Sequence, residues 1–595
     1  MSQNKVQPSP ISNRLGPIGK EANHDIFTTD GSHVFKTGGS PQKGFQEKTL
    51  HAREPNIGNF MENNQVLKLT KKFNLNGDEK EPKTGTKPDI EVEISNKEEP
   101  LGEGGFGAVY DTEVNQLGNV DQDKEENNIK YAVKVPKDSN NTNAFADLEK
   151  SELLIKEMVN FTKKTGVCAT LQTLELMVPV LGKVNVCLSN YDLNYDSDAM
   201  LMIKVDGKNG YYAILGSKSK SVKPIEGYDT EISVGNEKYY CVTDPKISLD
   251  IAFQKIFALR GLHDVGLVYG DVKLANVMIQ RENGEYTVRL IDIGSINQNG
   301  RLSGIFSTRT AAPEGFIGDV DSEKYAWNPK FDVFANAVDL PYIFFGEVAK
   351  KHLQKYYKLE ESSSEKTVAS FNRIKNKAFH FEKWGWFKTL FMYIFQNDTY
   401  KKYVSDEKDY LSKLEGSKVF AERGAYQNRL FLGDIFSAYE YADDKDVEET
   451  LKEYENSKFK NPNFSPPNFP ENMTNAQKMR YMYWHLGFLE TDSDIKLGTS
   501  QNVVKDKGVY PTEVIHSLSL LQMYSTDPNP EKRISSRAVE RVLLHLKRIV
   551  DQWKDGQYRI VNENGLISGD GLSPEEWEMV DVILPRNEAN KKNKN

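Results

Sequence analysis

Cysteine is scarce in this sequence. Its 595 residues include three cysteines, Cys168, Cys187 and Cys241, at uneven spacing. A disulfide framework needs more cysteines in a shorter chain, and a zinc site needs them in close pairs. The sequence therefore predicts neither, and we expect the protein to work in a reducing, cytoplasmic or other intracellular environment.

Long apolar runs and an excess of positive charge are also missing. No apolar run approaches the ~18 residues that a membrane-spanning helix needs, and the N-terminal residues lack the apolar core of a secretory signal. The formal net charge is −9, whereas nucleic-acid binding requires a basic surface. We therefore expect no membrane span and no nucleic-acid partner.

Residues 1–88 have few regularly spaced apolar side chains and are rich in Asn, Gly, Lys, Ser and Pro. Such a composition cannot bury enough apolar surface to offset the entropy of ordering. We predict a disordered leader that ends before the alternating pattern "IEVEI" at residues 90–94. The chain as a whole is 38% apolar, which is enough for a large core.

Two further segments show the periodicity of regular structure. The run "IKYAVKV" at residues 129–135 alternates like a strand and carries Lys134. Residues 144–163 change to helical spacing. The inward stripe of that helix would consist of Phe145, Leu148, Ile155 and Val159. Glu152 falls on the same stripe, and a carboxylate on an apolar face requires a partner.

The stretch "LVYGDVKLANVMIQ" at residues 267–280 places Asp271, Lys273 and Asn276 in one short loop between two apolar segments. It follows an apolar helical run, "ISLDIAFQKIFALRGLH", and leads through an Asn-Gly turn into a second strand that ends at Asp292. Catalytic groups are commonly held on loops at strand ends. We therefore expect the hairpin to bring Asp292 back toward Asp271 and Asn276.

Residues 101–109 read "LGEGGFGAV" and lie between two predicted strands. Glycines in such a loop let backbone N–H groups approach phosphate oxygens without a Cβ atom in the way. The pattern alone is weak evidence, because a tight turn has the same composition. A dinucleotide-binding loop would open a helix, and this one opens a strand.

Taken in order, these motifs resemble the eukaryotic-type serine/threonine protein kinase family. The order is a glycine loop, a lysine in "YAVK", a helix glutamate, the Asp-x-Lys-x-x-Asn loop, "DIG" at 292–294 and "APE" at 312–314. Two later segments, "FDVFANAVDL" and "LLQMYSTDPNPEKRIS", also resemble the family. There Asp332 would brace the catalytic loop and Arg533 would pair with Glu314.

The resemblance implies an α+β, two-lobed protein kinase fold with insertions and a disordered N-terminal arm. The kinase domain would span residues 89–550, with an N-lobe at 89–245 and a C-lobe at 246–550. A further insertion would fall within 167–246, where "AMLMIKV" and "YYAIL" both read as strands. Residues 551–595 would be a tail with a short capped helix at "SPEEWEMVDVIL".

Residues 345–510 exceed what the family needs, and we interpret them as an insertion. Its aromatic clusters "HFEKWGWFKTLFMYIFQ" and "MRYMYWHLGFLE" are typical of helical core. The alternative is a docking subdomain for a specific partner, which would dock there or activate the protein.

The resemblance implies a nucleotide site for ATP. Lys134 would hold its α- and β-phosphates and be oriented by Glu152, while Glu149 is the alternative partner but falls off the apolar stripe. Val109 and Ala132 would flank the adenine. The remaining implied nucleotide-binding residues are Leu101, Gly102, Glu103, Gly104, Gly105, Phe106 and Gly107.

The resemblance also implies the chemical roles of the loop residues. Asn276 and Asp292 would provide oxygen ligands for Mg²⁺. Asp271 would accept the proton of a substrate hydroxyl, and Lys273 would neutralise the transferring phosphate. A lysine at this place is similar to the serine/threonine-specific branch, so the expected activity is phosphorylation of serine or threonine on a protein, with autophosphorylation.

The sequence departs from the family before Asp271, where Tyr269 and Gly270 replace the usual His and Arg. The missing arginine predicts less dependence on phosphorylation of the activation segment.

A glycine before the catalytic aspartate also resembles small-molecule kinases of the aminoglycoside-phosphotransferase type, so a transferase acting on a small molecule or lipid is one alternative. A pseudokinase or interaction scaffold is another. The polar leader and the insertions resemble bacterial effector kinases that act inside host cells.

Overall fold

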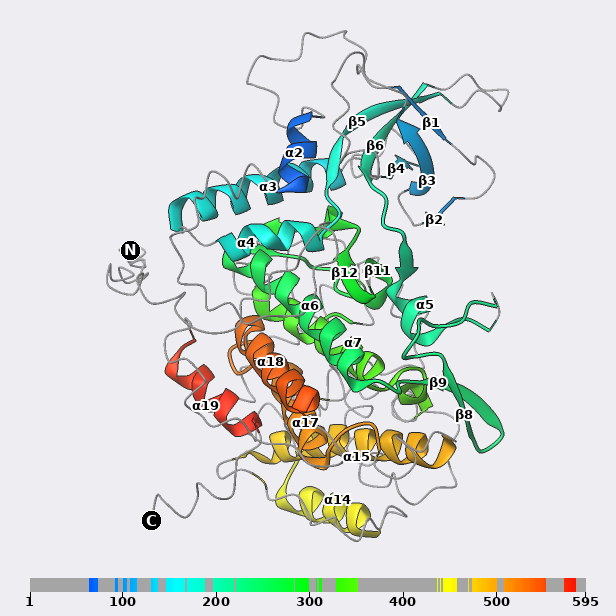
Figure 1. Cartoon of the computed structure of the whole chain (residues 1–595). Helices are drawn as coiled ribbons and strands as arrows, with labels where there is room; N and C mark the ends of the chain where they lie inside the picture. Colours follow the sequence, from blue (N-terminus) through cyan, green and yellow to red (C-terminus); the bar gives the residue numbers. More distant parts are fainter. Residues whose placement is uncertain are drawn as a thin grey trace, which may run out of the picture.

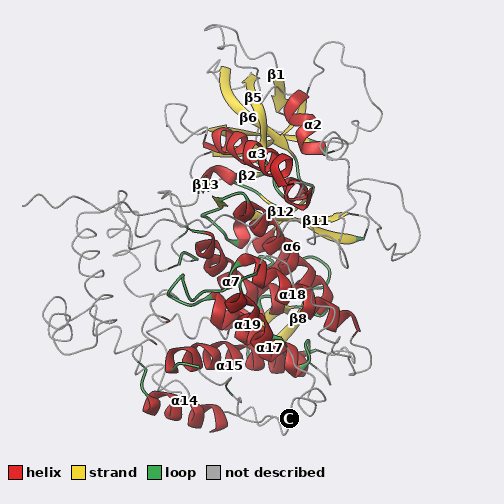
Figure 2. Ribbon diagram, turned by 90° about the vertical axis from the view of Figure 1, so that its left-hand side faces the viewer, coloured by secondary structure: helices red, strands yellow, loops and turns green. Residues whose placement is uncertain are grey.

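A computed structural model gives the fold of the chain (Figure 1). The structure describes residues 64–72, 91–94, 100–103, 107–114, 130–136, 146–165, 168–187, 196–218, 221–282, 284–298, 307, 310–312, 328–351, 436, 439, 442–456, 469, 473–499, 508–552 and 572–584. It is a mixed α+β fold, with antiparallel sheet near the N-terminal end followed by a helical region, and it is consistent with a kinase-like fold (Figure 2).

A six-stranded sheet forms the upper part of the molecule, in the order β1-β5-β6-β4-β3-β2. The strands are β1 (Glu91–Ile94), β2 (Gly102–Glu103), β3 (Gly107–Val114), β4 (Tyr131–Pro136), β5 (Val180–Cys187) and β6 (Asp196–Ile203). All hydrogen-bonded pairs are antiparallel except β1 with β5. The predicted strands in "IEVEI", "IKYAVKV" and "AMLMIKV" are thus confirmed.

Helix α3 (Ala146–Thr165) packs against β5 (Figures 1 and 2). The helix was predicted, but its buried face is rotated from the predicted stripe: Ile155 is buried as expected, whereas Leu148 and Val159 are only partly buried. Phe145 lies outside the described residues. The buried residues of α3 are Asp147, Ser151, Leu154, Ile155, Met158 and Thr162, whereas Glu152 is exposed. Ser151 Oγ accepts a hydrogen bond from the Val180 N–H at 2.7 Å. The buried face of α3 therefore includes polar residues and does not coincide with the most apolar face of the helix.

The prediction of a disordered leader through residue 88 is wrong for residues 64–72. Helix α2 (Gln65–Lys72) lies beside α3 and β5 in both views. Val66, Leu67 and Leu69 on it are at most 4% exposed. The Asn64 side chain caps the helix by accepting from the Leu67 N–H at 3.1 Å. The eight-residue helix was missed because its apolar residues are too few to define a period.

The chain passes from the six-stranded sheet to the lower part through residues 204–206, which connect β6 to β7 (Gly207–Asn209). Strand β7 pairs with β11 (Val277–Glu282), which pairs with β12 (Glu285–Leu290). The predicted hairpin around Gly284 is therefore confirmed. The segment "YYAIL" is not a strand but part of helix α5 (Gly210–Leu215), because Asn209 caps it through the Tyr211 N–H. Strands β8 (Thr230–Val234) and β9 (Glu237–Cys241) form a separate hairpin.

Helices form the lower part. Helix α6 (Pro245–Asp264), the predicted apolar helix, packs on α7 (Pro329–Phe345) and α18 (Ser536–Gln552). Around them lie α14 (Asp444–Asn456), α15 (Asn475–Gly498), α17 (Thr512–Ser525) and α19 (Pro574–Ile583). Short elements complete the described chain: α4 (Cys168–Gln172), η2 (Thr173–Leu176), β10 (Leu267–Val268), η3 (Leu274–Asn276), η4 (Ile293–Ser295) and β13 (Asn297–Gln298).

The aromatic residues of "MRYMYWHLGFLE" are core, as the first of the two interpretations predicted. Tyr481, Tyr483 and Trp484 on α15 are at most 1% exposed, so they cannot form a docking surface in this conformation. The segment "HFEKWGWFKTLFMYIFQ" lies outside the described residues. The predicted C-terminal helix is confirmed as α19, with Ser573 and Glu576 forming a capping box. Among the described residues, no helix combines the length and apolarity that crossing a membrane requires.

Candidate active site

The loop after β10 is held in place by Asp332 on α7. Its carboxylate accepts hydrogen bonds from the backbone N–H groups of Tyr269 at 2.7 Å and Gly270 at 2.8 Å. Gly270 has φ +85°, which is strained for residues with a Cβ atom. The backbone conformation at residue 270 therefore explains why a glycine precedes Asp271, where the family usually has an arginine. The brace by Asp332 agrees with what the resemblance implied.

The structure brings Asp271, Lys273 and Asn276 together. Asp271 Oδ2 accepts from Lys273 Nζ at 2.6 Å and from Asn276 Nδ2 at 3.0 Å. Asp271 Oδ1 is buried and has no hydrogen-bond partner within the described part of the chain. A buried, unpaired acceptor is costly, so this oxygen is suited to receive a hydrogen bond from an incoming group. Lys273 Nζ also donates to Ser307 Oγ at 2.8 Å, a contact that the sequence did not reveal.

Asp292 returns to this loop, as the hairpin predicted. The Ile291 N–H donates to the Asn276 carbonyl at 3.0 Å, which joins the two segments. Asp292 itself has φ +58° and ψ +60°. A left-handed conformation at a residue other than glycine costs on the order of 1–3 kcal/mol and is often found at functional sites. Its side chain is 48% exposed and its Oδ1 lies 3.0 Å from Lys134 Nζ.

Lys134 pairs with Asp147, not with Glu152 or Glu149. Lys134 Nζ donates to Asp147 Oδ2 across the space between β4 and α3. Burial lowers the pKa of Lys134, but the Asp147 and Asp292 carboxylates outweigh it, so the pKa is raised and the ammonium stays charged. Burial and the nearby Asp292 carboxylate raise the pKa of Asp147. They outweigh Lys134 and the Gly294 N–H, which lower it, so the pKa stays above its ordinary value.

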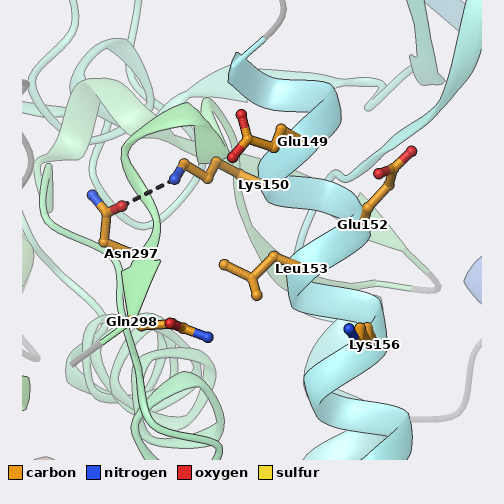
Figure 3. Close-up of a pocket in the computed structure, with 7 residues that line it drawn as sticks. All are labelled: Glu149, Lys150, Glu152, Leu153, Lys156, Asn297 and Gln298. Atoms are coloured by element: carbon orange, nitrogen blue, oxygen red, sulfur yellow. Dashed lines mark hydrogen bonds between the residues drawn. The ribbon is translucent and has the colours of Figure 1, made fainter. Parts of the chain in front are cut away.

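Glu149 and Glu152 instead line an open pocket of about 290 Å³ between α3 and β13 (Figure 3). In this view Glu152 points away from the strand, and Lys150 donates to Asn297 Oδ1 at 3.0 Å. The prediction that Glu152 orients Lys134 is therefore wrong. Asp147 could have been found as the acidic residue of the first turn that shares a face with Ser151, Leu154 and Met158, the buried positions of α3.

Three implied nucleotide-site residues share one face of the sheet. Val109 lies opposite Lys134 in the β3–β4 register, and directly opposed residues point to the same face. Ala132, two residues before Lys134, also points there and is 3% exposed. The face that carries Lys134 toward Asp292 thus also carries Val109 and Ala132.

The glycine loop is described only at its two ends. Gly102 pairs with Val109, and Leu101, with 54% exposure, donates its N–H to the Val109 carbonyl at 2.7 Å. A Cβ atom on Gly107 would lie 2.7 Å from the Val135 carbonyl oxygen, so this position has no room for a side chain. Glu103 lies in β2 opposite Ala108. Residues 104–106, which include Gly104, Gly105 and Phe106, lie outside the described residues.

The oxygen donors Asn276 and Asp292 suit Mg²⁺, which is usually held by one or two carboxylates together with substrate phosphates. Within the described ranges, no group of three or more His, Cys, Asp or Glu side chains could hold a metal by itself.

Arg533 is fully buried and donates to the carbonyl oxygens of Asp527 at 2.9 Å and Lys330 at 2.6 Å. Its guanidinium lies 5.0 Å from the Phe334 ring centroid. Its expected partner, Glu314, lies outside the described residues.

Comparison with known proteins gives a distant and partial similarity to protein kinases. Over 110 residues the chain is 33% identical to "Dual serine/threonine and tyrosine protein kinase" of Bos taurus, 32% to that of Homo sapiens and 31% to that of Mus musculus. The matched segment is 18% of this chain and spans 12% of the length of each relative. No protein-family model matches the chain. The similarity is to protein kinases in general and indicates no finer group.

Proposed function

We propose that this chain is a protein kinase that uses ATP and Mg²⁺ to phosphorylate serine or threonine on a protein substrate, itself included. The observation that carries the proposal is the buried Asp271 Oδ1, which has no hydrogen-bond partner among the described residues and lies in the same loop as Lys273 and Asn276. The Lys134–Asp292 contact supports it, and the partial similarity to protein kinases supports ATP as the phosphate donor.

The nucleotide side of the reaction would depend on Lys134. A lysine whose ammonium is fixed by Asp147 and lies 3.0 Å from Asp292 can hold phosphate oxygens next to the carboxylate that would bind their metal. Mg²⁺, when bound, cancels charge on the phosphates. Asn276 and Asp292 would hold it.

The acceptor side would depend on Asp271. The substrate hydroxyl donates to Asp271 Oδ1, its oxygen forms a bond to the γ-phosphorus, and the bond between that phosphorus and the β–γ bridging oxygen breaks. The hydroxyl proton passes to Asp271 and ADP leaves. Lys273 Nζ, 2.6 Å from Asp271 Oδ2, would neutralise charge on the transferring phosphate.

The test is intact-mass spectrometry of the purified full chain with ATP and Mg²⁺, alone and with a lysate whose own kinases are inactivated. We expect phosphate-sized mass increments that are absent from Asp271→Asn and Asp292→Asn. Glu152→Gln, an exposed carboxylate on α3, is the matched control and should retain transfer. Fragmentation of the products then identifies the modified residue as serine, threonine or tyrosine.

Other outcomes point to the alternatives. ATP binding without transfer to any protein would favour an interaction scaffold, and transfer only to small molecules or lipids would favour the second alternative. Transfer that survives both Asp271→Asn and Asp292→Asn would contradict the assigned site. Tyrosine products alone would contradict the proposed acceptor.

A further inference from the structure

The segment that joins β7 to α5 lies directly against the candidate catalytic loop. Strand β7 pairs with β11 and places Asn209 opposite Met278. The next residue, Gly210, is the first of α5. A Cβ atom at Gly210 would lie 2.7 Å from the Leu274 carbonyl oxygen, so a glycine is needed for the two backbones to approach this closely. The chain that arrives from the six-stranded sheet therefore touches the loop itself.

Asn209 uses both ends of its side-chain amide at this contact. Its Oδ1 accepts a hydrogen bond from the Tyr211 N–H at 3.1 Å and so caps α5. Its Nδ2 donates to the Ala275 carbonyl at 2.5 Å. The two partners fix which end of the amide is oxygen, because the Tyr211 N–H requires an acceptor and the Ala275 carbonyl requires a donor.

Helix capping alone does not explain the asparagine. Ser, Thr, Asp and Asn all cap a helix, because each offers a side-chain oxygen. Among them, only asparagine has its acceptor and its N–H donors on separate atoms. Asn209 can therefore cap α5 and donate to a second element at the same time, and the structure shows it doing both.

The second hydrogen bond holds the peptide group that directly precedes Asn276. The Ala275 carbonyl and the Asn276 N–H belong to one planar unit. Within the loop, the Asn276 N–H donates to the Lys273 carbonyl at 2.9 Å, while Asn209 holds the opposite side of the plane. Asn276 Nδ2 donates in turn to Asp271 Oδ2 at 3.0 Å. A peptide plane that is fixed on both sides sets the direction from which the Asn276 side chain reaches Asp271.

The other end of the connection between β6 and β7 is fastened to the six-stranded sheet. Lys204 Nζ lies 2.7 Å from Asp111 Oδ2 on β3, and the Lys204 N–H donates to the Lys130 carbonyl at 2.9 Å. Asp206 Oδ2 lies 2.5 Å from Lys130 Nζ. The connection thus has polar contacts to the sheet at one end and the Asn209 contact to the loop at the other.

We propose that Asn209 is a positioning residue for the candidate catalytic loop, because its Nδ2 holds the Ala275 carbonyl and thereby orients Asn276 toward Asp271. A hydrogen bond open to water adds little to stability, since water can replace the lost partner. Water does not fix a direction, so the contribution of this bond is to orientation. The effect on catalysis rests on the proposed phosphoryl transfer, and Asn209 acts on it only through Ala275 and Asn276.

Three substitutions at residue 209 separate capping from the contact with the loop. Asn209→Asp keeps the shape and the capping oxygen but has no N–H to donate. Asn209→Ser keeps a capping oxygen on a shorter side chain and adds no charge. Asn209→Ala removes both hydrogen bonds. If Asn209 only caps α5, the Asp and Ser variants should behave like the wild type, and the Ala variant alone should be impaired.

We expect the Asp and Ser variants to lose kcat on the order of tenfold, because small misplacements of catalytic groups have effects of at least that size. Their KM for ATP should stay within about twofold and their melting temperatures near that of the wild type, since the cap is kept. The matched control is Asn328→Ser at the cap of α7, where Asn328 Oδ1 accepts from the Lys330 N–H at 2.8 Å. Its kcat should stay within about twofold of the wild type.

The proposal is overturned if the Asp and Ser variants keep the wild-type kcat. A slow Asp variant beside a Ser variant of wild-type rate would assign the effect to the added charge and would overturn it as well. A kcat that simply follows the melting temperature across the three variants would reduce Asn209 to a helix cap.

Hydrogen exchange at the Asn276 amide gives a readout that does not require activity. We expect faster exchange in the Asp and Ser variants than in the wild type and in Asn328→Ser, because the same peptide group loses its contact on the carbonyl side. If the wild type transfers no phosphate, the proposed function fails, while the exchange rates still decide whether Asn209 holds the loop. Unchanged exchange in both variants would refute the contact even in an active enzyme.

Discussion

Gly294 leaves room for the carboxylate of Asp147. A Cβ atom at residue 294 would collide with Asp147 Oδ1, and the Gly294 N–H lowers the pKa of the same carboxylate, against the raising effect of burial. The partner of Lys134 on α3 is thus an aspartate that contacts the segment directly after Asp292. The shorter carboxylate requires α3 to approach closely, and the glycine permits that approach.

The partner of Lys134 can be tested by a matched pair of substitutions on one helix. Asp147→Asn removes the charge that pairs with Lys134, so we expect kcat/KM for ATP to fall on the order of 10- to 100-fold. Glu152→Gln makes the same chemical change at an exposed position of α3 and should leave kcat/KM within about twofold. Steady-state kinetics at varied ATP measures both. The reverse ranking would restore Glu152 as the functional partner.

This correction shows where the sequence is informative and where it is not. The loop residues Asp271, Lys273 and Asn276 were predictable because they lie within six consecutive positions and share one turn. The Lys134 partner was harder to predict, because choosing Asp147 over Glu152 requires knowing which face of α3 is buried, and that face depends in part on contacts such as Ser151 with Val180.

Other features could not be predicted from the sequence, for a similar reason. The strands, the hairpin and the main helices follow from periodicity and turn residues. Asp339 belongs to a helix whose sequence predicts burial on all sides, and its ion pair depends on Lys255, which reaches it from helix α6. Long-range contacts of polar side chains leave no local pattern.

We expect Ser307 to support the reaction rate through its hydroxyl group and not through phosphorylation. Its Oγ accepts from Lys273 Nζ at 2.8 Å, so Ser307→Ala should lower kcat on the order of tenfold. Ser307→Thr keeps a hydroxyl and should retain most of the rate. Ser307→Asp should not rescue, because its carboxylate would compete with Asp271 for Lys273. Phosphate release or transfer assays on the three variants measure this, and rescue by Asp alone would indicate regulation by phosphorylation instead.

Asp492 makes the stability of the helical region depend on pH. It lies on α15 and accepts from the backbone N–H groups of Val509 at 2.7 Å and Tyr510 at 3.4 Å. Burial raises its pKa from 3.8 to about 7, against the lowering effects of these N–H groups and of Lys496. Between these two values the folded protein holds a proton that the unfolded chain has lost. Stability therefore falls as pH rises through that window.

The substitution Asp492→Asn removes this titration but keeps an oxygen for both N–H groups. We expect the melting temperature of the variant to exceed that of the wild type increasingly from about pH 5 to pH 8. Calorimetry across that range measures the difference. Parallel curves for the two proteins would show that Asp492 is already charged at pH 5 in the folded state.

Helix α2 should stabilise the six-stranded sheet and α3 as an integral part of the fold. Leu69 is 1% exposed and packs with Val133, Leu181 and Leu201 in the core of the sheet. Leu69→Ala should lower the free energy of unfolding by about 2–4 kcal/mol, the range for buried leucines. Denaturant titration of the full chain measures this free energy. If the six-stranded sheet with α2 and α3 unfolds separately from the helical region, the value is taken from the transition of the sheet region.

The matched control is the neighbouring residue on the exposed side of the same helix. Lys68 is exposed, so Lys68→Ala should change the free energy of unfolding by less than about 0.5 kcal/mol. Equal effects of both substitutions would mean that α2 does not pack on the sheet in solution. A large effect of Leu69→Ala alone would establish that the folded unit begins before residue 88, because a leader without fixed structure has no buried leucine to lose.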